Sequence, residues 1–355
     1  MIPRRAIASL VLLLPLAVLA AGGGSDLSPG DGIGPDVTAD LAALPHYAPG
    51  PVPFPKGASY LAPDGAITVV GYNDMREMLE ATDRLFQATH PGFRFHLVLK
   101  GTKTAPPALA RGLSAFAPMG AEFTDDERAY FGKTTGTEPV LFRVAHDSIT
   151  PRALSSPQGI FVNRANPLGM LTTDQVARIF TIGQAGGDLT AWRELGLTGA
   201  WAGLPIHPTG PGPDTAIAIF MRRHKFGNHP YARGLIPFHE SDDVIRRIGE
   251  DPLAIGFASL CRPTPLVKVV AIDRMDGRPA VRGSARDIIS GSYPYDRHLL
   301  IYARRPTAGS LDPFVREYLR LVLSREGQEA VARCPQHYLP LNPDDLRSEL
   351  AKLDP

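Results

Sequence analysis

The chain has 355 residues, more than one hydrophobic core usually supports, so two folding units are expected. Lys and Arg number 37 against 36 Asp and Glu, and no long run carries one sign; the net charge of +1 therefore excludes the basic surface of a nucleic-acid-binding protein. A composition of 44% hydrophobic and 21% charged residues is that of an ordinary soluble globular protein.

The N-terminus has the features of a secretory signal peptide. Arg4 and Arg5 precede an apolar run, Leu10–Leu19, that is too short to span a bilayer comfortably. Small residues follow at 20 and 21, so we predict a cleaved signal peptide at 1–21 and a periplasmic protein; the alternative is a retained membrane anchor. No Cys stands at the cleavage junction, which argues against a lipoprotein.

A stretch rich in Gly, Pro, Ala and Asp follows at 22–65 and predicts a flexible lead-in, with folded structure from Ala66. Strands and helices then alternate twice, at Ile67–Val70, Met75–Phe86, Phe93–Lys100 and Ala108–Leu113. Asn73 or Asp74 is suited to cap the first helix. This alternation predicts a parallel sheet covered by helices.

The same patterns continue to the C-terminus. Further strands are predicted at Gly159–Asn163, Leu204–Pro208, Ala254–Ala258 and His298–Ala303. Further helices are predicted at Thr172–Phe180, which opens with a capping box, at Ala216–Arg223, at Val244–Gly249, and at Pro313–Arg325 continued by Gly327–Arg333.

Catalytic and metal-binding signatures are absent from the sequence. It contains no G-x-S-x-G, H-E-x-x-H, Walker loop or Cys-x-x-Cys, so we predict that the protein is not an enzyme and has no cofactor or metal site. The ten His are scattered, and we expect lone surface residues; a cluster of His207, His224 and His239, or a metal site at His337 beside Cys334, is the less favoured alternative. The two cysteines, Cys261 and Cys334, are compatible with one disulfide or with two separate buried thiols.

Four stretches in a fixed order carry a family resemblance. They are Gly159–Asn163 with Asn166-Pro167; Leu171–Phe180 with Asp188–Trp192; the Y-P…R segment Gly291–Arg297; and Phe314–Leu341 with its Y-L-P-L ending. Together they resemble the phosphate-binding-protein-like family of periplasmic ABC transporter solute-binding proteins, and the resemblance covers the chain from about Ala66 to Leu341.

The resemblance implies an α/β, two-lobed periplasmic binding fold of type II, in which each lobe is a mixed sheet flanked by helices. Lobe I would comprise 66–155 plus 300–355, and lobe II 156–299. Two crossover strands, near Gly159–Asn163 and Tyr293–Ala303, would join them. It also implies a monomer that carries phosphate or a related small oxyanion in the cleft to an inner-membrane ABC permease.

In the family, phosphate is held by backbone N–H groups at helix starts, hydroxyls, an Arg and an Asp. Carried over position by position, the ligand-binding residues are Asn73 in the first loop; Thr102, Lys103 and Thr104 in the second; Gly120 in the third; and Thr209, Gly210 and Thr215 in the fourth.

Two charged parts of that site are replaced here. Gly120 stands at the family's Asp position, unless Glu122 substitutes for it, and Thr209 stands at the Arg position. Pro213, at a Ser position, lacks an N–H donor. Two functions therefore remain: a phosphate-type receptor, or a divergent member that serves another small ligand or acts as a periplasmic sensor or interaction protein.

Overall fold

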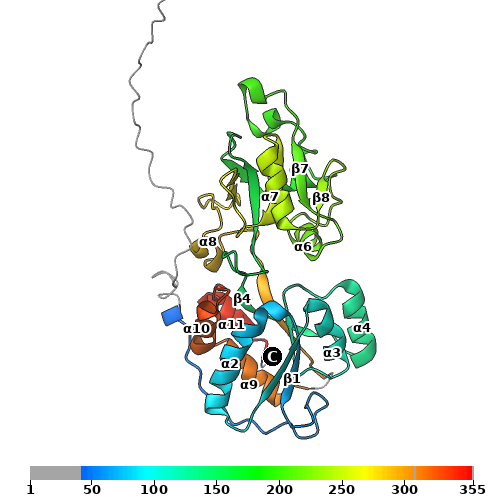
Figure 1. Cartoon of the computed structure of the whole chain (residues 1–355), viewed down its shortest axis with the longest axis vertical. Coiled ribbons are helices and arrows are strands. Elements are labelled where there is room, and N and C mark those ends of the chain that lie inside the picture. Colours follow the sequence, from blue (N-terminus) through cyan, green and yellow to red (C-terminus); the bar gives the residue numbers. More distant parts are fainter. Residues whose placement is uncertain (1–40, 307–308, 354–355) are drawn as a thin grey trace, which may run out of the picture. The chain divides into compact units, whose positions relative to one another are not determined.

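The computed structural model describes residues 41–306 and 309–353, and it confirms the α/β class. The described residues form four β-sheets with helices around them (Figure 1). The predicted signal peptide lies outside the described residues. Among those described, no helix has the length and apolarity needed to cross a membrane.

The first sheets are built from both ends of the chain. Strand β1 (Ile67–Gly71) pairs in parallel with β2 (Phe95–Leu99). Strand β12 (His298–Ala303) lies between β3 (Ala117–Met119) and β4 (Val140–His146), antiparallel to both. Hydrogen bonds from Tyr72 N–H to Pro118 O and from Ala115 N–H to Thr68 O place β1 beside β3, so the two sheets lie next to each other.

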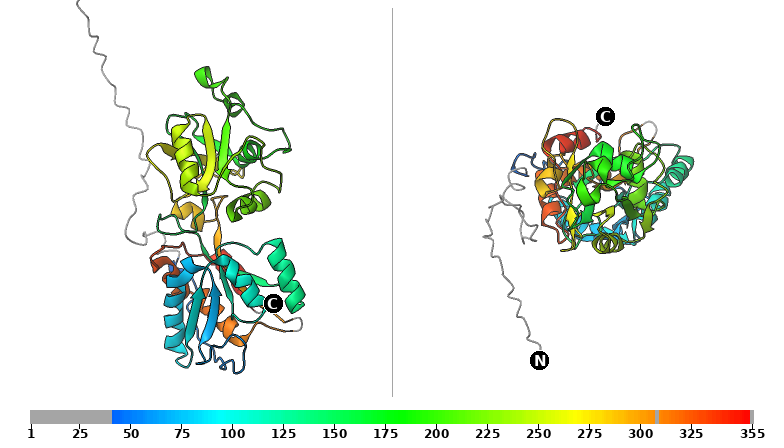
Figure 2. Two further views of the ribbon diagram at one scale, coloured as in Figure 1. Left: turned by 45° about the vertical axis from the view of Figure 1, so that its right-hand side comes forward. Right: turned by 90° about the horizontal axis from the view of Figure 1, so that it is seen from above.

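An aromatic cluster holds helices against these strands. The helices and 3-10 turns are η1 (Asn73–Met75), α2 (Arg76–Thr89), η2 (Thr102–Thr104), α3 (Ala105–Ala110), α4 (Asp125–Thr135), α9 (Pro313–Val322), α10 (Arg325–Arg333) and α11 (Pro343–Leu350). Phe86 of α2 packs edge-on against Phe93 and Phe314, with ring centroids 5.3 and 5.5 Å apart. Figure 2 shows α2 running alongside β1 and β2.

The second group of strands comes from the middle of the chain. Its five-stranded mixed sheet has the order β10 (Val267–Val269), β5 (Gln158–Asn163), β9 (Ala254–Ser259), β7 (His207–Pro211) and β8 (Ile236–Phe238). A small parallel pair joins β6 (Met170–Thr172) to β11 (Ala271–Asp273). The accompanying helices and turns are α5 (Thr173–Phe180), η3 (Trp192–Leu195), η4 (Gly199–Trp201), α6 (Ala216–His224), α7 (Ser241–Glu250) and α8 (Ala285–Ile289).

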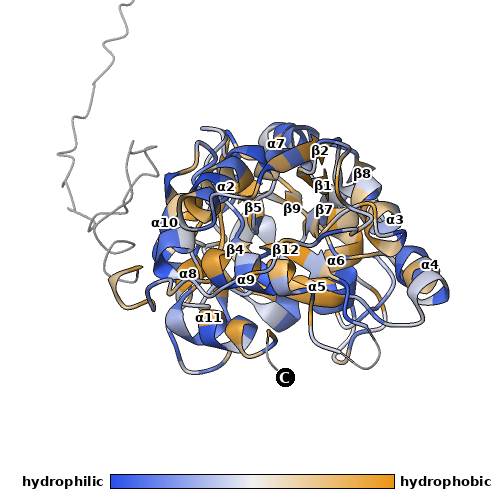
Figure 3. Ribbon diagram, turned by 90° about the horizontal axis from the view of Figure 1, so that it is seen from below, coloured by the Kyte–Doolittle hydropathy of each residue, from blue (hydrophilic) through white to orange (hydrophobic). Residues whose placement is uncertain are grey.

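Helix α7 illustrates how the pattern places the core. Its sequence alternates charged residues with Val244, Ile245 and Ile248, all three of which are buried, and Figure 3 shows both kinds of residue along its ribbon. Helix α5 begins at the predicted capping box, with Thr172 and Gln175 bonding each other's backbone N–H groups. Cys261 and Cys334 are both free and buried, so they are two separate thiols and not a disulfide.

Two element predictions were wrong in detail. The first helix is capped by neither Asn73 nor Asp74, because Asp74 turns inward and accepts hydrogen bonds from Leu154 N–H and Tyr338 O–H. The C-terminal helix does not continue through Ser324, whose side chain caps a separate helix, α10.

Residues 41–65, predicted as part of a flexible lead-in, pack on the fold. Leu41 and Leu44 are buried. Tyr47 donates its N–H to Glu326 (2.7 Å) and its O–H to Glu317 (2.8 Å), and Gly50 N–H donates to Glu317 (2.9 Å). The Gly- and Pro-rich composition predicts flexibility. The hydrogen bonds that order this segment could not be foreseen, because their acceptors lie about 270 residues away on α9 and α10.

We predict that, under native conditions, the Tyr47 and Gly50 amide protons exchange at least about tenfold more slowly than free amides. Glu317→Ala should remove protection of Gly50 and spare Tyr47, and Glu326→Ala should do the reverse, because each carboxylate accepts from one of the two amides. Unprotected exchange of both amides in the unchanged protein would mean that this segment is free.

Candidate functional site

Three loops meet where β1, β2 and β3 end. Gly101 N–H, after β2, donates to Gly71 O at the end of β1 (3.0 Å), and Tyr72 N–H donates to Pro118 O of β3 (3.0 Å). In α/β folds, ligands bind at such carboxyl ends of strands. The structure therefore gathers the first three predicted loops at one edge.

The first two loops offer donors of different kinds. The side chains of Asn73 and Lys103 are exposed, and Thr102 and Thr104 are half-buried. The Thr104 hydroxyl donates to Gly101 O (2.7 Å), which closes the turn before α3. To donate to a ligand, this hydroxyl must give up that contact.

The geometry of the third loop shows why position 120 holds Gly and not an acidic residue. A Cβ atom at Gly120 would lie 2.5 Å from Cε1 of Tyr72, so the Tyr72 ring fills the space that a side chain at 120 would need. The Tyr72 hydroxyl is held by the Ser155 hydroxyl at 3.1 Å. An Asp at 120 and this placement of Tyr72 are therefore mutually exclusive.

The fourth predicted loop is partly a strand. Thr209 and Gly210 belong to β7 and are buried, and the Thr209 hydroxyl donates to Ile236 O of β8 (3.0 Å). Thr215 caps α6 by accepting Ala218 N–H (3.2 Å), and it donates to Gly212 O (2.8 Å). These hydroxyls serve the local fold, which corrects the loop prediction for 209 and 210.

Side chains of α6 reach the third loop and its following helix. Glu122 lies 3.0 Å from His224, so its carboxylate is engaged with an imidazole. Arg223 donates to both carboxylate oxygens of Asp125 at 3.0 Å. His207, His224 and His239 are scattered, and each lies against a different carboxylate: Asp251, Glu122 and Glu240 respectively.

Two segments, called the crossover segments below, run beside each other next to these loops: residues 146–158, from the end of β4 to the start of β5, and residues 293–298, which lead into β12. Asp147 N–H donates to Arg297 O (2.9 Å), and Gln158 N–H donates to Tyr295 O (3.0 Å). This pairing sets Asp147 and Arg297 as neighbours although they are far apart in the sequence.

The side chains of Arg297 and Asp147 form a buried ion pair. Arg297 Nη1 lies 3.4 Å from Asp147 Oδ2, Nη2 donates to Gly120 O (2.8 Å), and the guanidinium lies 5.4 Å from the centre of the Phe220 ring. Burial raises the pKa of Asp147 to about 7, against the attraction of Arg297. Neither Asp147 carboxylate oxygen has a hydrogen-bond partner among the described residues.

A small cavity opens beside Arg297. Its volume is about 90 Å³, well above the ~15 Å³ that one water needs, so a small anion is within its range. The lining residues include Gly120, Glu122, Arg143, Phe220, Arg297 and His298. Burial lowers the pKa of His298 to about 3, so its imidazole is neutral.

Of the predicted ligand residues, only Gly120 lines this cavity. The sequence-based prediction missed Arg297 and Asp147. Arg297 stood in the Y-P…R segment, where the return strand was expected but no ligand role was assigned. Arg297 lies near the third loop only because the two crossover segments pair, and the sequence does not show that pairing.

Comparisons with known proteins give the chain its context. A family model described as the PBP superfamily domain matches residues 58–326. The phosphate-binding protein PstS of Pseudomonas aeruginosa is 27% identical over 280 residues, which cover 78% of this chain and 83% of that protein. Protein SphX of Synechococcus elongatus is 25% identical over 198 residues, 54% of each chain.

Solved structures agree with the fold. An ABC-type phosphate transport receptor from Vibrio cholerae superposes with a TM-score of 0.50 at 17% identity, covering 77% of this chain and 98% of that one. PstS from Borrelia burgdorferi gives 0.51 at 14% identity, covering 78% and 98%. These likenesses confirm the two-lobed α/β fold class.

We predict that Gly120→Ala destabilises the protein by about 1–3 kcal/mol, because the added methyl meets the Tyr72 ring. In a Tyr72→Ala background, the same change should cost less than half as much, as measured by urea unfolding in a double-mutant cycle. Equal costs in both backgrounds would show that Tyr72 does not control position 120.

Proposed function

The chain belongs to the PBP superfamily, and on that premise we propose that it is a solute-binding protein for phosphate or a related small oxyanion. The observation that carries the proposal is the 27% identity with a phosphate-binding protein over most of both chains. The ligand would lie in the cleft between the lobes, and the partner would be an inner-membrane ABC permease.

Arg297 supplies the positive charge in this proposal. The family's Arg position is Thr209, whose buried hydroxyl is bound to β8, so charge must come from elsewhere. Arg297 is fixed by Gly120 O and Asp147, and a guanidinium held in this way can present its remaining N–H groups to an oxyanion. The second loop, through Thr104 and Lys103, would add donors from the strand ends.

Asp147 takes the place of the family's acid. With a pKa near 7, it is part protonated at neutral pH, whereas an ordinary carboxyl is not. A carboxylate beside the anion accepts the proton that phosphate carries and sulfate lacks, which favours phosphate.

The lobes, location and assembly follow the family pattern. We propose lobe I as 66–155 plus 300–355 and lobe II as 156–299, with the remaining predicted site residues, Asn73, Thr102 and Thr215, at the loops facing the cleft. Export by a cleaved signal peptide, a periplasmic monomer and the absence of catalysis complete the proposal.

A second function is favoured by one feature of the same site. Arg297 already bonds Gly120 O and pairs with Asp147, so a phosphate must share a guanidinium that has two protein partners. In the alternative, the pair is purely structural, and the protein serves another small ligand or acts as a sensor or interaction protein.

Isothermal titration calorimetry of the purified protein should give saturable binding of phosphate at one site, and at least tenfold weaker binding of sulfate. The melting temperature should rise in millimolar phosphate. Absence of heat together with an unchanged melting temperature would overturn the phosphate proposal and favour the alternative.

Two variants locate the site. Arg297→Lys keeps the positive charge but loses the paired N–H donors of the guanidinium. Thr104→Ala loses one hydroxyl donor. Each should weaken phosphate binding roughly 10-fold or more, since a hydrogen bond to a charged group contributes about 1.5–3 kcal/mol.

Thr134→Ala is the matched control for Thr104→Ala. The Thr134 hydroxyl also donates to a nearby carbonyl, that of Tyr130 (2.8 Å), but it lies exposed on α4. Circular dichroism and melting curves establish that the variants are folded. Unchanged phosphate affinity in folded Arg297→Lys would contradict the role given to Arg297, without touching the proposal that the protein binds phosphate.

A further inference from the structure

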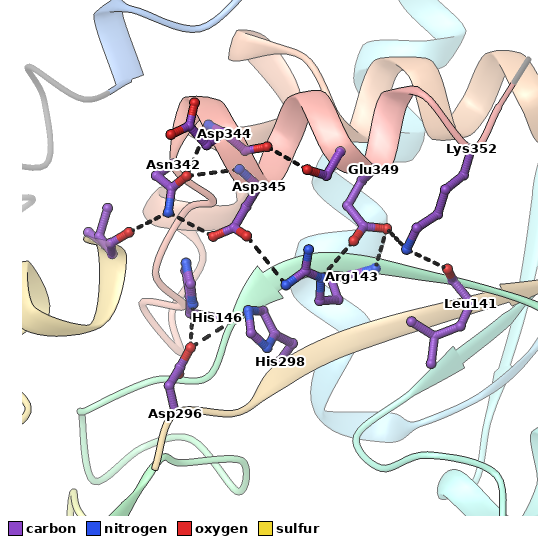
Figure 4. Close-up of polar contacts among 12 residues, drawn as sticks. Leu141, Arg143, His146, Asp296, His298, Asn342, Asp344, Asp345, Glu349 and Lys352 are labelled. Carbon is purple, nitrogen blue, oxygen red and sulfur yellow. Dashed lines mark hydrogen bonds and ion pairs between the residues drawn. The ribbon is translucent and has the colours of Figure 1, made fainter. Parts of the chain in front are cut away.

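Two histidines and an aspartate converge where the crossover segments pair. His146 ends β4 and His298 begins β12, and the antiparallel register sets the two residues directly opposite each other. Their ring centroids are 4.6 Å apart. Asp296 lies two residues before His298, and Figure 4 shows it reaching both imidazoles.

The spacing of the ligating atoms suits a metal ion. Asp296 Oδ2 lies 2.7 Å from His146 Nδ1 and 3.6 Å from His298 Nε2, and one ligand atom from each residue lies within 4.8 Å of the others. Ligands about 2.0–2.2 Å from a tetrahedral zinc ion stand roughly 3.3 Å from one another, so small side-chain shifts complete the geometry.

Several polar atoms of the cluster have no hydrogen-bond partner among the described residues. They are His146 Nε2, Asp296 Oδ1 and His298 Nε2, and the His146 side chain is 99% buried, at 1% exposure. Buried polar atoms are nearly always paired, because an unpaired one costs free energy. A bound cation would satisfy the Asp296 carboxylate and the His298 ring together.

Two nearby arginines already pair with other carboxylates, whereas burial lowers the pKa of Lys225, a third nearby cation, against the attraction of Asp296. Arg143 lies 2.6 Å from the buried Glu349 and 3.3 Å from Asp345 (Figure 4). Arg297 pairs with Asp147. The carboxylate of Asp296 therefore forms no ion pair with either arginine, and it faces the two imidazoles.

We propose that His146, Asp296 and His298 bind a divalent transition-metal ion of the zinc type. Two imidazoles and one carboxylate favour such ions, whereas Mg²⁺ and Ca²⁺ prefer all-oxygen sites. His298 also lines the cavity beside Arg297, so a fourth coordination position is open to solvent or a small ligand.

This inference is independent of the proposed function. The metal would link one crossover segment to the other, since His146 belongs to the first and Asp296 and His298 to the second. Asp296 and His146 are 150 residues apart, and the sequence therefore predicted no metal site.

The test is calorimetry of the untagged protein, stripped with EDTA and titrated with ZnCl₂ in phosphate-free buffer. We expect one site with a Kd in the micromolar range or tighter, and no comparable binding of MgCl₂ or CaCl₂. Co²⁺ should give the visible absorption of a four-coordinate ion with imidazole and oxygen ligands.

His298→Asn and Asp296→Asn should each weaken zinc binding at least 100-fold and abolish the cobalt spectrum. His239→Asn is the control, because that imidazole is 88% exposed and also lies beside a carboxylate, Glu240. Circular dichroism and melting curves establish that both variants are folded; the His298 side chain is 19% exposed, so Asn at this position keeps a polar group where the His lay.

Two outcomes would overturn the proposal. One is the absence of saturable zinc binding to the folded, unchanged protein. The other is zinc binding by folded His298→Asn and Asp296→Asn with the affinity of the unchanged protein, which would move the ion to other ligands.

Discussion

The antiparallel pairing of the two crossover segments is the constraint on which the site depends. It consists of few backbone hydrogen bonds, from Asp147 N–H to Arg297 O and from Gln158 N–H to Tyr295 O. Yet it brings the buried Arg297–Asp147 pair under the third loop, and it sets His146 opposite His298. Both charged residues of this pair thus come from the crossover segments and not from the predicted ligand loops.

This arrangement gives a physical reason for the altered loops. The Tyr72 ring occupies the space beside Gly120, so an acid cannot stand there, and Asp147 is the nearest carboxylate to Arg297. A buried ion pair contributes little net stability, because the desolvation of both charges offsets their attraction. Arg297 of this pair also lines the cavity, which fits the role in ligand binding proposed for it better than a role in stability.

Local patterns in the sequence predicted the elements well. The strand β1, the helix α6 and the capping box of α5 depend on residues a few positions apart, and the structure has them where they were predicted. The family was also identified from the order of its motifs.

Features that depend on distant contacts were not predicted. The lead-in carries a Gly- and Pro-rich composition, but carboxylates of α9 and α10 hold it. Thr209 sits in a Pro-rich segment that resembles a loop, and β8 and β9 draw it into a sheet. Asp74 was suited to a cap, and Tyr338, 264 residues away, draws it inward.

The central claim is that a small oxyanion binds beside Arg297, and a crystal structure of the protein grown with phosphate tests it most directly. The account predicts tetrahedral density within hydrogen-bond distance of the Arg297 guanidinium. Phosphate density at a different place in the cleft, or a cavity beside Arg297 that stays free of phosphate when phosphate binds in solution, would contradict it.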